Sequence, residues 1–348
     1  RREAGAHMNA GARLRADSAP DDSSAGIQPA PLVVAIILNW NKDDLTLETL
    51  ASLREQTYPR LQILVLDNGS DNQREALARI RAAFPEVRTQ ASKRNLGFAG
   101  GCNVGMRAAL ELGADYLLLL NNDVLLQPHA ITELVAALQA DIGAGAAGPL
   151  IYYASEPERV WFGGGKVRMG GRVLPEHGED AGIQVGAPTV ESEWLPGTAM
   201  LVRREAVARV GLMDASYFLY WEDVEWCFRL RHAGYRLLLV PRSIIYHKVN
   251  ATSGDLPLTI VYYWERNRLR FIERWGTWCS RITAWVKIVW RSVSWRIKLP
   301  DDPQARVKLE AYRDYLLRRS GPRRASARPE RAAIPAEFDF APRRGQPR

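Results

Sequence analysis

The chain contains no run of about 18 apolar residues, so no segment has the length that a membrane-spanning helix needs. It has only three cysteines, and their odd number and wide spacing fit neither a disulfide framework nor a zinc cluster. Scarce, scattered cysteines favour a reducing compartment such as the cytoplasm. Residues 1–31 lack the apolar stretch of a secretory signal and are rich in Ala, Gly, Ser, Asp and Pro, which predicts a disordered tail.

Two nucleotide-binding motifs are also missing. No Gly-x-Gly-x-x-Gly follows the first apolar run, and no Gly-x-x-x-x-Gly-Lys-Ser/Thr occurs anywhere. A dinucleotide-binding dehydrogenase and a P-loop enzyme are therefore disfavoured. A glycine-rich patch does occur at Gly97, Gly100, Gly101 and Gly105, but its spacing is equally typical of a tight turn with close helix packing.

Excess positive charge is absent from most of the chain. Residues 261–348 hold 21 Lys and Arg against 9 Asp and Glu, which gives this part a net charge of +12. Because the whole chain carries +8, residues 1–260 carry −4. An enzyme acting on nucleic acid would place its basic groups around the site rather than on an appendage, so we expect no nucleic-acid partner.

The sequence does contain a repeated alternation of short apolar runs with segments of helical spacing. Val33 to Leu38, Ile63 to Leu66 and Tyr116 to Leu120 are apolar throughout, and each is followed by helical periodicity. Such strands predict an α/β protein whose mostly parallel sheet is covered by helices on both faces. The other predicted elements are helices at Asp43 to Leu53, Ala76 to Ala83, Pro128 to Gln139 and Glu222 to Ala233, and strands at Ala199 to Val202 and Arg236 to Val240.

Polar residues follow each of the three apolar runs. They are Asn39-Trp40-Asn41, Asp67-Asn68 and Asn121-Asn122-Asp123. In parallel sheets, ligands bind at the carboxyl ends of the strands, where these residues are expected. Asp67 precedes Asn-Gly, so it suits either a simple turn or hydrogen bonds to a nucleobase or ribose. A carboxylate such as Asp123 suits Mg²⁺ or Mn²⁺, and the alternative is a loop or helix-cap aspartate.

Six stretches within residues 32–253 form an ordered set. They are Val33 to Asn41 (VVAIILNWN), Ile63 to Asp71 (ILVLDNGSD), Arg94 to Asn103 (RNLGFAGGCN), Leu117 to Leu125 (LLLLNNDVL), Trp194 to Val202 (WLPGTAMLV) and Phe218 to Arg229 (FLYWEDVEWCFR). In this order they resemble family 2 glycosyltransferases of the GT-A fold, above all the rhamnosyltransferase-like members. The shared order is more specific than any single motif. The resemblance implies a nucleotide-diphospho-sugar transferase fold of the GT-A type with a mostly parallel central sheet.

The resemblance also implies contacts to a nucleotide-sugar donor and to a metal. The family's Asp-x-Asp metal motif reads Asn121-Asn122-Asp123 here, which leaves one carboxylate for Mg²⁺ or Mn²⁺ and predicts weak metal binding until the donor arrives. His247 lies where such members often place a metal-binding histidine, and its alternative is an ordinary loop histidine. The implied donor-binding residues are Asn39, Asn41, Asp67, Asn68, Arg94, Asn95, Gly97, Asn121 and Asn122.

Trp221 to Glu225 places three carboxylates within four residues near a predicted helix start. The helix dipole alone favours acidic residues there. An inverting transfer, however, needs a base to take the proton of the acceptor hydroxyl. Resemblance to the family's Glu-Asp motif implies that Asp223 is this base, with Glu222 as the second choice. The implied acceptor-binding residues are Trp194, Gly197, Trp221 and Glu225.

Six of the eleven tryptophans lie after Leu256, interleaved with Arg and Lys. An apolar stripe of helical spacing, with the basic residues largely beside it, predicts a basic amphipathic helix suited to an anionic membrane surface. The alternative is that the stripe packs on the catalytic domain or on a second copy in a homo-oligomer. Residues 301–348 carry paired arginines among Pro, Ala and Gly and are expected to be largely flexible. The stripe consists of Trp275, Trp278, Ile282, Trp285, Val289 and Val293.

Together these inferences predict a catalytic domain at 32–256, with a nucleotide-sugar half at 32–125 and an acceptor half at 126–256, before a Trp-rich helical extension at 257–300. The expected enzyme moves rhamnose or another hexose or deoxyhexose, with inversion, from a dTDP- or UDP-linked donor. The acceptor would be a glycan or polyprenyl-linked sugar in cell-surface polysaccharide synthesis, at the inner face of the cytoplasmic membrane. One rival is a sugar-phosphate nucleotidyltransferase, which should carry a basic glycine-rich loop at Asn39 to Lys42. The other is a non-catalytic nucleotide-sugar-binding scaffold.

Overall fold

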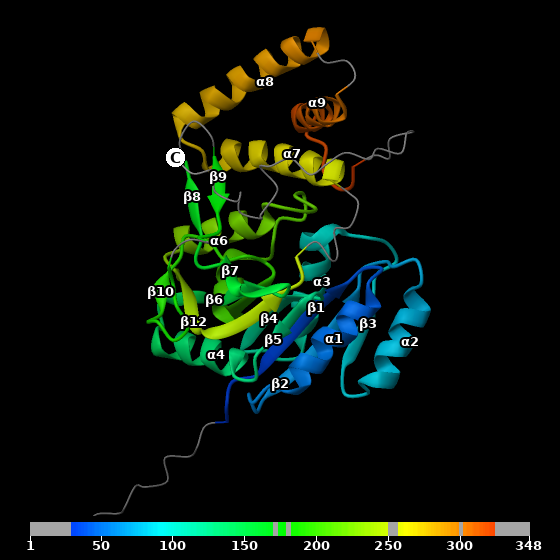
Figure 1. The fold of residues 1–348 in the computed structure, drawn as a ribbon, viewed down its shortest axis with the longest axis vertical. Helices are drawn as coiled ribbons and strands as arrows, with labels where there is room; N and C mark the ends of the chain where they lie inside the picture. Colours follow the sequence, from blue (N-terminus) through cyan, green and yellow to red (C-terminus); the bar gives the residue numbers. More distant parts are fainter. Residues whose placement is uncertain (1–28, 170–172, 179–181, 250–256, 299–301, 324–348) are drawn as a thin grey trace, which may run out of the picture. The chain divides into compact units, whose positions relative to one another are not determined.

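A computed structural model describes residues 29–169, 173–178, 182–249, 257–298 and 302–323. Figure 1 shows a mixed α/β architecture, in which helices pack against a large central sheet and further helices follow at the C-terminal end. The tail expected to be disordered at 1–31 lies almost wholly outside the described residues, and so does the part of the expected flexible tail 301–348 that follows residue 323. Among the described helices, none is long and apolar enough to cross a membrane.

The N-terminal half of the sheet is parallel, as the apolar runs predict. Strands β3, β2, β1 and β4 lie side by side in that order, and the pairings among these four are parallel. Most of β1 and β4 and the second half of β2 are buried because helices cover both faces of the sheet, whereas the edge strand β3 is mostly exposed. The strands are β1 (Val33–Asn39), β2 (Leu61–Asp67), β3 (Arg88–Ala91) and β4 (Tyr116–Asn121), and the helices between them are α1 (Asp43–Arg54), α2 (Gln73–Ala83) and α3 (Gly97–Glu111).

The second half of the sheet is mixed. Strand β11 (Ala199–Arg203) runs antiparallel between β4 and β6 (Ala144–Tyr153), and β6 pairs in parallel with β12 (Arg236–His247). Because β11 runs the opposite way, the residues just before it reach the carboxyl end of β4, where Asn121 N donates to Thr198 O at 3.0 Å. The remaining elements are β5 (Val124–Leu126), α4 (Ala130–Ala140), β7 (Glu156–Phe162), β8 (Lys166–Arg168), β9 (Leu174–Glu176), β10 (Val190–Glu191), α5 (Arg204–Val210) and α6 (Glu222–His232).

Strand β12 is longer than its sequence suggests. The sequence predicts a strand from Arg236 to Val240, yet the strand continues past Pro241 to His247. The proline lies where the pairing register with β6 shifts between Val240 and Ile244, a position that tolerates proline. His247 is therefore the last residue of a paired strand rather than a loop histidine.

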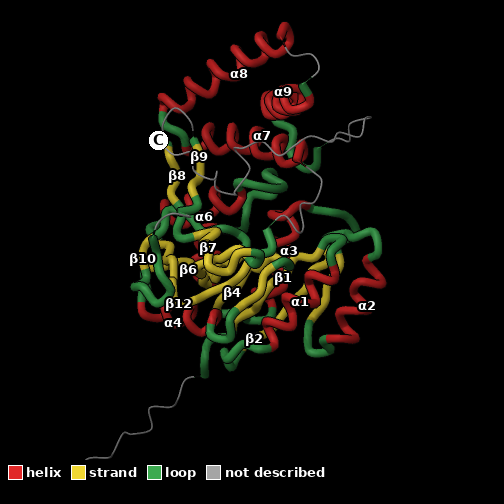
Figure 2. The backbone as a smooth tube through the Cα atoms, viewed as in Figure 1, coloured by secondary structure: helices red, strands yellow, loops and turns green. Residues whose placement is uncertain are grey.

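Three helices follow the sheet, and Figures 1 and 2 show them grouped together. The predicted extension consists of α7 (Pro257–Trp275) and α8 (Trp278–Lys298), while α9 (Pro303–Leu316) packs against α7. The expectation that residues 301–348 are largely flexible is wrong for α9, because Asp302 caps its N-terminus and apolar side chains bury one of its faces. The shared core of the three helices contains Leu269, Ile288, Tyr312 and Tyr315.

Candidate active site

A pocket of about 700 Å³ lies at the carboxyl edge of the sheet and is walled on one side by α7. It draws together segments that are far apart in the sequence, from the end of β1 to residues 259–264. Most of the residues expected to form a site line it. They are Asn68, Arg94, Asn95, Gly97, Asn121, Asn122, Asp123, Trp194, Gly197, Trp221, Glu222, Asp223 and His247.

Asp123 and His247 form a buried pair at the floor of this pocket. His247 Nε2 lies 3.2 Å from Asp123 Oδ1, because the antiparallel pairing of β12 with β5 sets His247 opposite Val124. Lys248 N also donates to Asp123 O at 2.9 Å, and this backbone bond holds the end of β12 beside Asp123. His247 Nδ1 is buried without a hydrogen-bond partner among the described residues. A carboxylate beside an imidazole can hold a divalent cation, although the described chain offers no cluster of three such ligands.

Asn68 orders the neighbouring loop. Its Nδ2 donates to Asn95 Oδ1 at 3.2 Å and to Gly97 O at 3.1 Å, and its Oδ1 accepts from Leu96 N at 3.1 Å. Gly97 has a φ of 75°, and a Cβ there would lie 2.3 Å from Phe218 O, so only glycine fits. This loop therefore touches the segment that precedes α6 across the pocket.

Three implied donor residues do not reach the pocket. Asp67 is fully buried and accepts hydrogen bonds from Gly69 N at 3.1 Å, Ser70 N at 2.9 Å and Asn39 Nδ2 at 2.8 Å. Asn41 N donates to Ser70 Oγ at 2.8 Å. Asn39, Asn41 and Asp67 therefore do not line the pocket, because their polar atoms hydrogen-bond around the turn after β2, and their contact with the donor stays a prediction.

Glu222 and Asp223 enter the pocket from the first turn of α6. Gly197 N donates to Asp223 Oδ2 at 3.0 Å, and Val224 N donates to Asp223 Oδ1 at 2.8 Å. Burial raises the pKa of Asp223, and these two N–H groups act against that rise. Burial, with Asp223 as a second cause, holds the pKa of Glu222 well above its usual range, and Glu222 Oε2 has no hydrogen-bond partner among the described residues.

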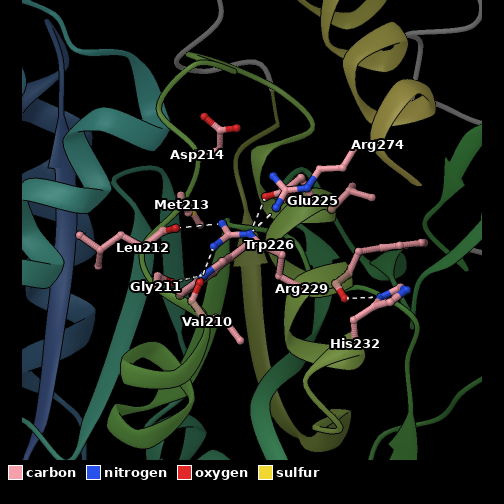
Figure 3. Close-up of polar contacts among 12 residues, drawn as sticks. Val210, Gly211, Leu212, Met213, Asp214, Glu225, Trp226, Arg229, His232 and Arg274 are labelled. Carbon is pink, nitrogen blue, oxygen red and sulfur yellow. Dashed lines mark hydrogen bonds and ion pairs between the residues drawn. The ribbon is translucent and has the colours of Figure 1, made fainter. Parts of the chain in front are cut away.

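Glu225 lies outside the pocket, contrary to its expected role with the acceptor. Its carboxylate is fully buried and is held by Arg229 at 2.9 Å and by Arg274 at 3.0 Å (Figure 3). Arg229 also donates to Val210 O at 2.7 Å and Leu212 O at 2.8 Å. Arg229 lies one helical turn after Glu225 in α6, and Arg274 comes from α7, so this glutamate ties two helices together.

Several residues that line the pocket escaped the sequence analysis. Trp161 packs edge-on against His247 with ring centroids 4.6 Å apart, and against His177 at 4.9 Å. Burial lowers the pKa of His177 to about 4, with His247 as a further cause. Nothing in their local sequence marks these residues, because only the folding of β7 and the β8–β9 hairpin brings them to the sheet edge. Trp40, which the sequence places at the ligand-binding edge of the sheet, also lines the pocket, and the other unforeseen lining residues include Phe98, Phe218, Tyr263 and Trp264.

Tyr263 and Trp264 belong to α7, which was expected to be part of an extension outside the catalytic domain. The described residues from Pro31 onward form one compact unit, and α7 forms a wall of the pocket. The boundary expected at residue 256 therefore does not separate an appendage from the site.

The pattern of strands and pocket residues matches a known family. The sequence profile described as "Glycosyl transferase family 2" matches residues 34–209, which is half of the chain. The chain belongs to glycosyl transferase family 2. Membership in this family means that the enzyme transfers sugars, and it removes the nucleotidyltransferase alternative.

Relatives within this family include rhamnosyltransferases. The chain is 29% identical over 265 residues to the N-acetylglucosaminyl-diphospho-decaprenol L-rhamnosyltransferase of Mycobacterium tuberculosis, covering 68% of this chain and 82% of that protein. It is 24% identical over 223 residues to the dTDP-rhamnosyl transferase RfbF of Shigella flexneri, covering 64% and 70%. Among solved structures, GalNAc-T7 with UDP, GalNAc and Mn²⁺ superposes with a TM-score of 0.58 at 19% identity, covering 82% of this chain and 55% of that one. This family 2 glycosyltransferase therefore has the GT-A fold.

Proposed function

We propose that this glycosyltransferase moves a deoxyhexose such as rhamnose from a dTDP- or UDP-linked donor to a hydroxyl of a lipid-linked glycan, with inversion and with a divalent metal. One observation carries the proposal: a single pocket holds the Asp123–His247 pair and the Glu222–Asp223 pair. The first pair suits a cation beside a diphosphate, and the second suits proton transfer. The named activity of the mycobacterial relative, on a decaprenol-linked acceptor, supports the donor and acceptor classes.

In this mechanism Asp223 is the base. Its carboxylate is aimed by Gly197 N and Val224 N, and it accepts the proton of the acceptor hydroxyl as that oxygen attacks the anomeric carbon. The bond from the anomeric carbon to the donor diphosphate breaks on the opposite face, so the configuration inverts. Glu222, with its raised pKa, keeps its proton and does not compete for the role.

Asp123 and His247 would hold Mg²⁺ or Mn²⁺, and the cation would offset the charge that builds on the departing nucleoside diphosphate. The residues fit such an ion, because a buried carboxylate lies beside a buried imidazole with an unpartnered Nδ1. Asn122 cannot serve as a second carboxylate, and its Nδ2 donates to Lys42 O and Thr46 Oγ1, both at 3.2 Å. The donor diphosphate is therefore expected to complete the ligand set.

The membrane is the proposed second partner. Helix α8 buries Ile288 against α7 and α9, and it leaves a continuous apolar face exposed. Arg281, exposed on the same helix, and the net charge of +12 over residues 261–348 suit an anionic surface. Docking there would bring a polyprenyl-linked acceptor to the enzyme. The exposed apolar side chains are Trp278, Ile282, Trp285, Val286, Val289, Trp290 and Val293.

A panel of nucleotide sugars tests the central proposal by thermal shift, with and without Mn²⁺ or Mg²⁺. We expect selective stabilisation by dTDP-rhamnose or a UDP-sugar, only with metal present, and little stabilisation by metal alone. His247→Ala and Asp123→Asn should each abolish the metal-dependent part, whereas Glu225→Gln, outside the pocket, should retain it. Equal stabilisation of wild type and Asp123→Asn by donor and metal would refute the metal assignment, and no response to any donor would favour a scaffold.

A further inference from the structure

Three bulky residues just before α6 have a left-handed backbone. Phe218, Tyr220 and Trp221 have φ values of 67°, 66° and 75°. Residues with a Cβ rarely adopt this conformation, and they keep it only where the surroundings fix it. The segment leads directly into Glu222 and Asp223, so the contacts that fix its backbone also place the two carboxylates.

One side chain of α7 supplies most of these contacts. Asn267 is fully buried, and its Nδ2 donates to Tyr217 O at 2.7 Å, Leu219 O at 2.8 Å and Tyr220 O at 2.9 Å. Asn267 Oδ1 accepts from Arg266 Nε at 3.0 Å, which sets the orientation of the amide. Three carbonyl groups of one strained segment thus converge on a single amide group.

Arg266 reinforces the same segment. Its guanidinium is fully buried, and Nη2 donates to Tyr217 O at 2.9 Å. Nη1 donates to Gly321 O at 2.9 Å, on the chain that follows α9. A buried guanidinium is stable only when its N–H groups are bonded, so Arg266 holds a rigid position between the two segments.

The rings of the segment pack on α7 as well. Phe218 stacks on Tyr263 with centroids 5.2 Å apart and an interplanar angle of 19°. Trp221 packs against Trp264 at 5.4 Å and Phe271 at 5.1 Å. Both the carbonyl groups and the side chains before α6 are therefore held by one helix, and that helix lies beyond the region that the family profile matches.

We infer that Asn267, oriented by Arg266, is a positioning residue for the transfer reaction. Its amide holds the segment 217–221, including the left-handed residues Phe218, Tyr220 and Trp221, and thereby places Asp223 at the acceptor hydroxyl. Asn267 itself does not line the pocket and acts only through the segment. The inference rests on the proposed function in one respect, namely that Asp223 is the base.

Asn267→Ala and Asn267→Asp test the inference in the full-length enzyme, with dTDP-rhamnose and polyprenyl-diphosphate-linked N-acetylglucosamine as substrates. The first removes the amide donors, and the second sets a carboxylate against the three carbonyl groups. Both should lower kcat at least about tenfold while the donor KM changes less than about twofold, because misplacing a catalytic group slows chemistry more than binding. The matched control is Asp314→Asn, because Asp314 is also buried and accepts a hydrogen bond from Tyr262 of α7 at 2.9 Å. We expect the kcat of this control to stay within about twofold of wild type.

Amide hydrogen exchange of residues 214–224 gives a readout that needs no turnover. Asn267→Ala should speed this exchange at least about tenfold, and Asp314→Asn should leave it unchanged. Wild-type exchange in a folded Asn267→Ala variant would overturn the inference, as would equal losses of kcat in Asn267→Ala and Asp314→Asn. If the wild type transfers no rhamnose, the proposed donor is wrong, and the exchange comparison still decides whether Asn267 holds the segment.

Discussion

Two adjacent carboxylates in the pocket have different surroundings. Burial raises the pKa of both Glu222 and Asp223. Asp223 receives N–H groups from Gly197 at 3.0 Å and Val224 at 2.8 Å, which favour its ionised form, and Glu222 Oε2 receives none from the described residues. Because such environments push two pKa values apart, Asp223 is the group expected to be ionised at neutral pH.

Asp223→Asn should lower kcat by about 10² or more, because the amide cannot accept the proton of the acceptor hydroxyl. Donor binding should persist in this variant. In the wild type, activity should fall as the pH drops through a pKa above the usual aspartate range, since the base works only when ionised. Pre-steady-state rates across pH check this, with Glu222→Gln as the control. An acid limb that disappears in Glu222→Gln would move the role of base to Glu222.

Glu222→Gln should stabilise the protein. The pKa of Glu222 is higher in the folded protein than in the unfolded chain. Below the unfolded-state pKa, Glu222 is protonated in both the folded and the unfolded state, so it does not reduce the free energy of unfolding. As the pH rises above that value the unfolded state ionises while the folded state does not, and stability is lost by about 1.4 kcal/mol per pKa unit of difference. Glutamine removes this loss. Urea unfolding should therefore show a gain for Glu222→Gln that is larger at pH 8 than at pH 5, and an equal or negative change at pH 8 would contradict the cause.

At the same scale, the sequence predicts some positions better than others. Asp123 and Asp223 lie in the pocket because each follows a recognisable strand or opens a recognisable helix. Asp67 also follows a recognisable strand, yet its carboxylate accepts hydrogen bonds from the turn and from Asn39 and does not line the pocket. Glu225 forms an ion pair with Arg274 of α7, and the local sequence around Glu225 cannot predict an ion-pair partner from another helix.

Between elements, a close backbone contact near the site joins the start of α3 to the segment before α6. Phe98 N donates to Phe218 O at 2.6 Å, and a Cβ on Gly97 would lie 2.3 Å from the same oxygen. The start of α3 and the segment before α6 therefore meet through backbone atoms. The spacing of the glycine-rich patch did not decide between a structural turn and a functional loop. The structure shows that Gly97 of this patch is required by its close approach to Phe218 O.

Gly97→Ala should lower both stability and activity. The positive φ alone costs about 1–2 kcal/mol with a side chain, and the clash would also push residues 217–221 away from α3. Gly113→Ala is the matched control, because Gly113 has a φ of 81° with no atom near an added Cβ. Thermal unfolding should show a loss in both variants, and kcat should fall at least about tenfold only in Gly97→Ala. Equal activities would show that the contact does not place the segment.

The sheet and its helices followed from periodicity, whereas the role of α7 did not. Alternating apolar runs and helical spacing define β1, β2 and β4, and their carboxyl ends define the edge where the pocket lies. Periodicity says which face of α7 is apolar but not what covers it. The segment before α6 and the pocket cover that face, so Tyr263 and Trp264 line the pocket and Asn267 contacts the segment. Contacts between segments so distant in the sequence need the structure.

At the scale of the whole molecule, helix α8 leaves an apolar face exposed among the described residues. Trp285, Val289 and Trp290 are 52%, 59% and 66% exposed, and the alternative that this stripe packs on the chain's own catalytic domain is wrong for them. Trp275 is different, because it packs on Phe228 and His232 at 5.9 and 4.4 Å. A membrane or a second copy of the chain remains to cover the face.

Replacing Trp285, Val289 and Trp290 with serine should weaken sedimentation with phosphatidylglycerol-containing vesicles by more than about tenfold, since burying one such side chain contributes about 1.5 kcal/mol or more. The unfolding temperature and donor binding should not change, because the three side chains are exposed. A matched triple variant carries serine at Ile142, Val185 and Val190, which are 89%, 56% and 41% exposed elsewhere on the surface. This control should sediment like the wild type, and salt should weaken both. If the wild type ignores the vesicles but forms a dimer that the α8 variant loses, the face binds a second copy and the membrane proposal is wrong.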